Sequence, residues 1–184
     1  SSIKTILHVI NKGGPCILIS HMGRPKNGYE KNLSLKNIVG ELQRLLNKKI
    51  TFVNDCIGDK AKKACQGSKK GEIILLENLR FYSEEELGEV SFAKSLSALG
   101  DIYINDAFGT AHRNHASTGI LPSFFKGKRA MGFLLSKEVE VLDKVFKNNT
   151  PPFLAIIGGA KVSSKIQVLT NLIIPQEVFL ILVT

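Results

Sequence analysis

Histidine and arginine side chains follow three apolar stretches of this sequence at similar, short distances. His21 and Arg24 follow "PCILIS", Arg80 follows "EIILLENL", and His112 and Arg113 follow "DIYINDAF" and a short glycine turn. The planar guanidinium group of arginine donates two parallel hydrogen bonds to a phosphate or a carboxylate. Burying several cations without a counter-ion is costly. The pattern therefore predicts that these side chains gather around a bound anion.

Each of these residues also has a simpler interpretation. A single arginine is most often a surface or salt-bridged residue, and a lone histidine beside a glycine turn is most often structural. Three arginines at the ends of successive strands favour the anion site instead.

The side chains can meet only if the preceding strands lie side by side and run in the same direction. Apolar runs at 15–21, 50–56, 72–79 and 101–108 have the length of buried strands. Between them, residues 34–48 have the apolar spacing of one helix face, with Ser34 as N-cap. Such alternation is typical of a parallel sheet covered on both faces. The sequence predicts an α/β fold, a Rossmann-like three-layer parallel sheet flanked by helices, with ligands beyond the carboxyl ends of its strands.

The same alternation continues along the chain. We expect helices at 58–67, within 84–100, at 136–149 and at 163–173, and strands at 129–135, 151–159 and 178–184. The segment "NNTPP" (148–152) ends one helix before a new strand. We therefore predict an N-terminal domain over 1–135, a connecting helix over 136–149, and the start of a second domain over 150–184, which is too short to bury its own core.

A second group of residues surrounds "AIIGGAKVSSKI" (155–166). A strand leads into Gly158 and Gly159, and Lys161 and Lys165 follow on a helix start. Glycines let a ligand approach the backbone, and the free N–H groups of a helix start attract phosphate. The segment lacks the spacing of a Walker A motif. A phosphate site and a plain strand–turn–helix connection both fit it.

The amino-acid composition of the chain indicates the kind of partner and the cell compartment that we expect. The chain has 184 residues, 43% of them hydrophobic, and residues 1–80 carry its whole net charge of +9. This favours an anionic partner, although many lysines fit a solvated surface equally well. Three scattered cysteines suggest reduced thiols, and no His/Cys cluster has metal spacing. No membrane span or signal peptide is apparent, so we expect a cytoplasmic protein.

Six segments occur in an order that resembles the phosphoglycerate kinase family. They are "ISHMGRP", "FVNDCIG", "ILLENLRF", "NDAFGTAHR", "GFLLSKEVEVL" and "FLAIIGGAKVSSKI". The resemblance implies a two-domain enzyme of glycolysis that moves a phosphoryl group between 1,3-bisphosphoglycerate and ADP, or in reverse between ATP and 3-phosphoglycerate. Mg²⁺ accompanies the nucleotide, and no protein-bound metal is expected. We expect a monomer that binds neither membrane nor nucleic acid.

The resemblance also assigns roles to residues. The substrate-binding residues would be His21, Met22, Gly23, Arg24, Arg80, His112 and Arg113. The nucleotide-binding residues would be Gly158, Gly159, Ala160, Lys161 and Lys165, with Lys165 also catalytic. Phosphoryl transfer depends on positioning and charge neutralisation, which suits such a set.

The sequence departs from the family pattern at several places. Ser2 stands where the family has an arginine thought to neutralise charge in the transition state, and Ser164 stands where the family usually has aspartate. The family's first strand, with its Asp-x-Asn pattern, and most of its nucleotide domain have no counterpart. We therefore expect an incomplete chain with little or no turnover.

Two other functions compete with this one. The chain could be a non-catalytic relic of the family that keeps its anion site. It could also bind nucleic acid, but aromatic residues make up only 7% of the chain and tryptophan is absent. This composition does not favour an RNA-binding sheet.

Overall fold

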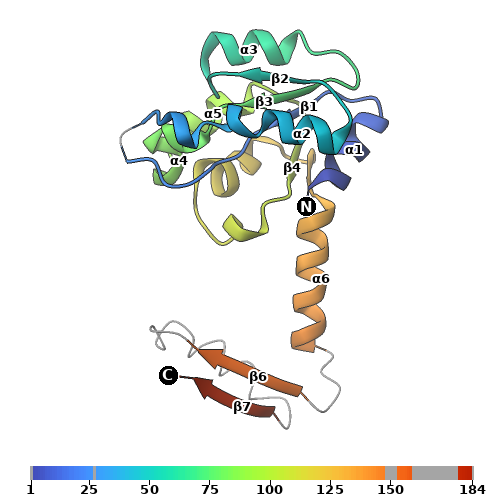
Figure 1. Cartoon of the computed structure of the whole chain (residues 1–184), viewed down its shortest axis with the longest axis vertical. Helices are drawn as coiled ribbons and strands as arrows, with labels where there is room; N and C mark the ends of the chain where they lie inside the picture. The colour runs from blue at the N-terminus through green and yellow to red at the C-terminus, as the bar shows by residue number, and fades with distance from the viewer. Residues whose placement is uncertain (1, 27, 148–152, 159–177, 184) are drawn as a thin grey trace. The chain divides into compact units, whose positions relative to one another are not determined.

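The computed structural model describes residues 2–26, 28–147, 153–158 and 178–183. The chain divides into two compact units, Ser1–Ser136 and Lys137–Thr184. The candidate anion site lies in the first unit, whose strands β1 to β4 are labelled in Figure 1. The domain limits expected from the sequence, at residues 135 and 149, stay a prediction.

A parallel sheet of three strands forms the centre of the first unit. Its strands are β1 (Cys16–Leu18), β2 (Ile50–Val53) and β3 (Ile73–Leu76), in the order β1-β3-β2. Ile73 is in register with Cys16 on one side and Ile50 on the other. All four side chains of β3 are buried, as expected for a central strand covered on both faces.

Helices cover both faces of this sheet. They are α1 (Ile3–Asn11), α2 (Val39–Leu46), α3 (Gly58–Gln66) and α5 (Val90–Ser97). Two further helices are α4 (Ser83–Leu87) and α6 (Phe133–Lys147). Successive side chains of a strand point to opposite faces. Ile73 and Leu75 accordingly pack with α1 and α2, whereas Ile74 and Leu76 pack with α3 and α5. The predicted three-layer α/β fold is confirmed.

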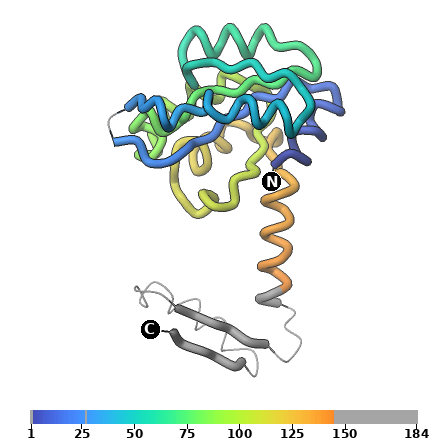
Figure 2. Tube along the Cα trace, viewed as in Figure 1, coloured from blue at the N-terminus to red at the C-terminus, as the bar shows by residue number. Residues whose placement is uncertain are grey.

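A second parallel pair joins the same core. Strands β4 (Tyr103–Asn105) and β5 (Arg129–Met131) pair with each other. Tyr103 is buried in the cluster that contains Ile74 and Leu76, and Ile17 of β1 packs against that cluster. The two sheets therefore share one hydrophobic core. Figure 2 follows the chain through both of them as a continuous trace.

Short turns of 3₁₀ or π helix connect these elements. The 3₁₀ turns are η1 (Lys31–Leu33), η2 (Leu35–Ile38), η3 (Leu79–Phe81), η4 (Phe108–Thr110) and η6 (Leu121–Phe124), and η5 (Ala116–Ile120) is a π turn. Of these, η3 and η4 follow β3 and β4 and carry the chain into the candidate site.

The second unit contains β6 (Phe153–Gly158) and β7 (Val178–Val183). These strands pair in parallel, with Phe153 in register with Val178. Strands were expected at both places. The helix expected at 163–173 lies outside the described residues.

Strand β3 is shorter than the pattern suggested. An apolar run predicted a strand over 72–79, but β3 ends at Leu76. The Asn78 side chain accepts a hydrogen bond from Arg80 N at 3.1 Å and so starts the turn η3. A side chain that hydrogen-bonds its own backbone offers the chain an alternative to the strand.

Helix α6 begins earlier than predicted. A strand was expected over 129–135, but β5 ends at Met131 and α6 starts at Phe133. The carboxylate of Asp106 accepts hydrogen bonds from the N–H groups of Leu134 at 2.9 Å and Leu135 at 3.1 Å. These groups would otherwise lack partners in the first helical turn.

Two further helices differ in detail. The helix expected within 84–100 is split into α4 and α5 at Gly88, which has a φ of 70°. The helix expected over 34–48 starts as the 3₁₀ turn η2, and the Ser34 hydroxyl accepts from Lys36 N as the predicted N-cap.

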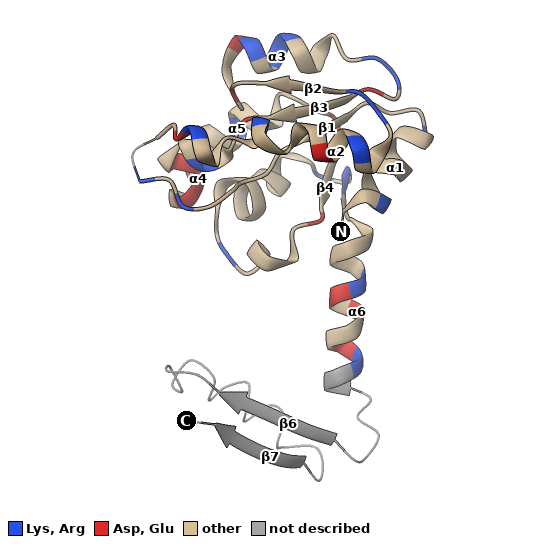
Figure 3. Cartoon of the chain, in the orientation of Figure 1, with Lys and Arg blue, Asp and Glu red and all other residues tan. Residues whose placement is uncertain are grey.

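Basic side chains are spread over the surface of the first unit. Figure 3 shows them on α2 and α3 and in several loops. Lys60, Lys62 and Lys63 of α3 are all exposed. Exposure of this kind agrees with the solvated-surface interpretation of these lysines.

Candidate functional site

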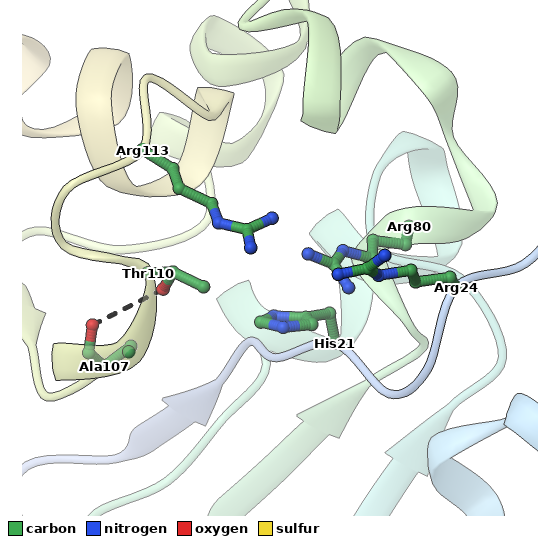
Figure 4. Close-up of a pocket in the computed structure, with 7 residues that line it drawn as sticks. His21, Arg24, Arg80, Ala107, Thr110 and Arg113 are labelled. Atoms are coloured by element: carbon green, nitrogen blue, oxygen red, sulfur yellow. Dashed lines mark hydrogen bonds between the residues drawn. The ribbon is translucent and has the colours of Figure 1, made fainter. Parts of the chain in front are cut away.

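A pocket of about 300 Å³ contains four of the side chains singled out in the sequence. Its lining residues are His21, Arg24, Arg80, Ala107, Gly109, Thr110 and Arg113. In Figure 4 the Arg113 side chain faces those of His21, Arg24 and Arg80 across the pocket. Residues from three separate strand ends therefore meet at one place.

The loop after β1 brings His21 and Arg24 to the pocket. Gly23 in this loop has a φ of 64°, a conformation that favours glycine. A Cβ atom at Gly23 would lie 2.6 Å from Cδ2 of Leu33. The backbone shape of the loop therefore favours glycine, and a larger residue would also displace the Leu33 side chain. Met22 and Gly23 shape this loop and do not line the pocket.

Arg80 is the most firmly held cation of the pocket. It lies in η3 directly after β3, and its side chain is only 7% exposed. Its Nη1 donates a hydrogen bond of 2.7 Å to the carbonyl oxygen of Gly23. Its buried Nε lies 3.0 Å from Oε1 of Glu86 and makes no aligned hydrogen bond with any described residue. Glu86 thus balances the charge of Arg80 without fully satisfying it.

Arg113 approaches the pocket from the segment after β4. Its N–H group donates to the carbonyl of Thr110 at 2.9 Å, and its own carbonyl accepts from Thr118 Oγ1 at 3.2 Å. Asp106, at the start of this segment, accepts from Thr5 Oγ1 at 2.8 Å and from two N–H groups of α6. The segment is therefore anchored at both ends.

The electrostatic field in the pocket is positive. Burial lowers the pKa of His21 below its ordinary value, and the charges of Arg80, His115 and Arg113 lower this pKa further. Glu86 acts in the opposite direction but does not offset them. The imidazole is therefore neutral near pH 7, and a bound anion would favour its protonation.

The other predicted substrate residue, His112, is exposed and does not line the pocket. A different histidine, His115, is buried, and its Nδ1 lies 3.9 Å from Oε1 of the buried Glu85. Sequence reasoning did not single out His115. The only signal for it was its place two residues after Arg113.

The residues expected to bind nucleotide fall almost entirely outside the described part of the chain. Gly158 is the last residue of β6. Gly159, Ala160, Lys161 and Lys165 lie outside the described residues. Ser2 precedes α1, and its hydroxyl makes no capping hydrogen bond.

The described residues contain neither a membrane-spanning helix nor a cluster of metal-binding side chains. None of their helices is long and apolar enough to cross a membrane. They include no group of three or more His, Cys, Asp or Glu side chains arranged to hold a metal ion. All three cysteines are free.

The whole chain is similar to one family of known proteins. The family model described as "Phosphoglycerate kinase" matches residues 1–182. The phosphoglycerate kinase of Dictyoglomus turgidum is 45% identical over 180 residues, which cover 98% of this chain and 45% of that protein. The chloroplastic phosphoglycerate kinase of Chlamydomonas reinhardtii is 49% identical over 172 residues, which cover 94% of this chain and 37% of that protein.

A solved structure has a similar fold. The structure of phosphoglycerate kinase from Coxiella burnetii superposes with a TM-score of 0.83 at 34% identity, covering 97% of this chain and 44% of that one. The chain thus spans less than half the length of these relatives. The family model matches nearly all residues of this chain, and the fold is similar to that of a solved member. The chain therefore belongs to the phosphoglycerate kinase family.

Proposed function

We propose that this chain provides the phosphoglycerate-binding part of a phosphoglycerate kinase, which transfers a phosphoryl group between 1,3-bisphosphoglycerate and ADP. One observation carries the proposal: Arg24, Arg80, Arg113 and His21 line a single pocket. A ligand with a phosphate at one end and a carboxylate at the other would neutralise the three arginines at two points and favour protonation of His21. Family membership supports the same substrate.

The chemical contribution of this pocket is orientation and charge neutralisation. The acceptor in the reverse reaction is the carboxylate of 3-phosphoglycerate, so no protein nucleophile is needed. Arg80 is fixed by Gly23 O and Glu86 before any ligand binds. A preorganised guanidinium group stabilises phosphate charge with little rearrangement, which lowers the cost of binding and of reaction.

The nucleotide half of the reaction is assigned from the family resemblance. Gly158, Gly159 and Ala160 would line the nucleotide site, and Lys161 and Lys165 would contact its phosphates. Mg²⁺ carried by the nucleotide would neutralise phosphate oxygens. Lys165 would act as the catalytic cation that follows the migrating phosphoryl group.

A second candidate function rests on Ser2. Its hydroxyl cannot supply the positive charge of the family arginine at that place. The chain would then be a relic that binds phosphoglycerate without transferring phosphate. Both candidates share the same anion pocket and differ in turnover.

Calorimetry with 3-phosphoglycerate tests the pocket. We expect Arg113→Ala to weaken binding by about 10- to 150-fold, the equivalent of roughly 1.5–3 kcal/mol for a hydrogen bond to a charged group. Arg44→Ala is the matched control, because Arg44 is exposed, pairs with Glu41 and does not line the pocket. Equal affinity of the Arg113→Ala variant and the unsubstituted chain would overturn the assignment.

A further inference from the structure

The side chain of Asn78 is fully buried at the end of β3, behind the anion pocket. Its Nδ2 donates to the carbonyl oxygens of Met22 at 2.8 Å and Leu33 at 2.9 Å. Its Oδ1 accepts from the N–H groups of Arg80 at 3.1 Å and Met22 at 3.3 Å. Both donors and both lone pairs of the amide are therefore used.

These four bonds join the turn at residues 78–80 to two segments that lie 45 and 56 residues earlier in the sequence. Met22 is held through both its N–H and its carbonyl group, between the pocket residues His21 and Arg24. The backbone of Arg80 is held by the same amide oxygen. One side chain thus fixes the backbone positions from which three of the four basic residues of the pocket extend.

Neighbouring contacts hold Asn78 itself in place. The buried carboxylate of Glu77 accepts from Asn78 N at 2.7 Å, from Ser34 Oγ at 2.6 Å and from Leu35 N at 2.9 Å. The turn that contains Leu33 is therefore fixed to the same end of β3. Arg80 Nη1 adds a direct bond to Gly23 O.

An amide is the side chain that suits this position. Aspartate would turn acceptor atoms toward two carbonyl oxygens and add a buried charge. An apolar side chain would leave the half-buried backbone groups of Met22 and Leu33 without this partner, which is unfavourable. Asparagine satisfies all of these groups at once.

We propose that Asn78 is a positioning residue of the anion pocket. It holds the loop at residues 21–24 and the η3 turn in one arrangement, so that His21, Arg24 and Arg80 face the ligand before it binds. The inference rests on the proposed function for the identity of the ligand. Asn78 does not line the pocket, so its effect passes through the residues that it holds.

The test compares Asn78→Ala with two controls in the full chain. Asn37→Asp changes an exposed amide that also donates to two carbonyls, those of Lys31 and Asn32. Leu96→Ala removes a buried side chain of α5 outside the pocket and lowers stability by an ordinary packing defect. Calorimetry with 3-phosphoglycerate and thermal unfolding are measured for each variant.

We expect Asn78→Ala to weaken 3-phosphoglycerate binding by at least about tenfold, and both controls to stay within about twofold of the unsubstituted chain. A readout without ligand is the pKa of His21 by NMR. Loosening the loop moves the imidazole away from Arg80, so this pKa should rise in Asn78→Ala and stay unchanged in the controls. If Asn78→Ala does not fold, Asn78→Ser, whose hydroxyl keeps part of the network, replaces it.

Unchanged affinity in the Asn78 variant overturns the inference. It is also overturned if Leu96→Ala, at an equal loss of Tm, weakens binding by as much, since a general stability effect would then explain both. If the unsubstituted chain does not bind 3-phosphoglycerate, the proposed function fails. The His21 pKa comparison still decides whether Asn78 positions the loop.

Discussion

At the scale of single residues, the pocket brings three arginines and a histidine close together. Among the described residues, few contacts with acidic or carbonyl oxygen atoms offset the positive charge of the arginines. His21 is half-buried, and its pKa is lowered by burial and by its electrostatic interactions with Arg80, His115 and Arg113. Arg80 is almost fully buried and has Glu86 as its ion-pair partner. The basic side chains of such a site repel one another, and a bound anion reduces this repulsion.

The lowered pKa of His21 makes stability depend on pH. Above the ordinary histidine pKa of about 6.5, the residue is neutral in both folded and unfolded chains and has no effect. Below it, the unfolded chain takes up a proton first, so stability falls as the pH drops toward the lowered folded pKa. Urea unfolding at pH 7.5 and 5.5 should show a smaller loss in His21→Gln than in the unsubstituted chain. The same loss in both would contradict this role for His21.

Glu86 opposes the cations that act on His21. We expect Glu86→Gln to lower the pKa of His21 further, because the substitution removes a carboxylate that raises this pKa. NMR titration of the histidine ring protons measures the shift. Glu84→Gln is the control, since Glu84 lies on the same helix but does not act on His21. A pKa that rises in Glu86→Gln would show that the geometry of Arg80 had changed.

At the scale of elements, the segment after β4 is tied to two helices by a single carboxylate. Asp106 accepts from Thr5 Oγ1 of α1 and from two N–H groups at the start of α6. Thr5 Oγ1 in turn accepts from Phe133 N at 3.0 Å. The strand end that leads to Arg113 thereby also caps a helix.

Loss of this cap should destabilise the first unit. We expect Asp106→Ala to lower the free energy of unfolding by about 1–3 kcal/mol, the worth of a helix cap and of buried groups left unpaired. Asp106→Asn should cost less, since its amide oxygen can still accept from the two N–H groups of α6. Chemical denaturation measures both variants. Asp101→Ala, at an exposed position, serves as control, and an equal loss there would argue against the cap.

At the scale of the whole molecule, the described residues form an anion pocket, whereas turnover would also depend on the residue at position 2. Ser2 stands in place of the family arginine, and its hydroxyl carries no positive charge that could stabilise a migrating phosphoryl group. Binding and catalysis should therefore separate in this chain.

We expect binding of 3-phosphoglycerate without appreciable turnover in a coupled assay with ATP and Mg²⁺. Attraction of phosphate without alignment of both substrates gives little stabilisation of the transition state. Lys165→Ala is assayed in parallel. Robust turnover that Lys165→Ala abolishes would contradict the expectation and would show that the chain assembles a working site.

The sequence alone was enough to predict the fold class and the edge of the sheet that carries the site. Apolar runs such as "EIILLEN" can be buried only between two layers, and strands of this kind run parallel when helices connect them. His21, Arg24, Arg80 and Arg113 follow three of these strands. His21, Arg24 and Arg80 come together because β1 and β3 pair in parallel, whereas Arg113 follows β4, which pairs with β5 in a second sheet.

Only the tertiary structure decided how these residues are oriented. His112 is exposed beside Arg113, and this outcome depends on the turn η4 and on contacts that strand patterns do not encode. Asn78 forms hydrogen bonds with Met22, which lies 56 residues earlier, and Asp106 forms one with Thr5, which lies 101 residues earlier. Such hydrogen bonds form only when segments that are distant in sequence pack together. The positions of their donors and acceptors follow no periodic pattern along the chain, so the sequence does not reveal them.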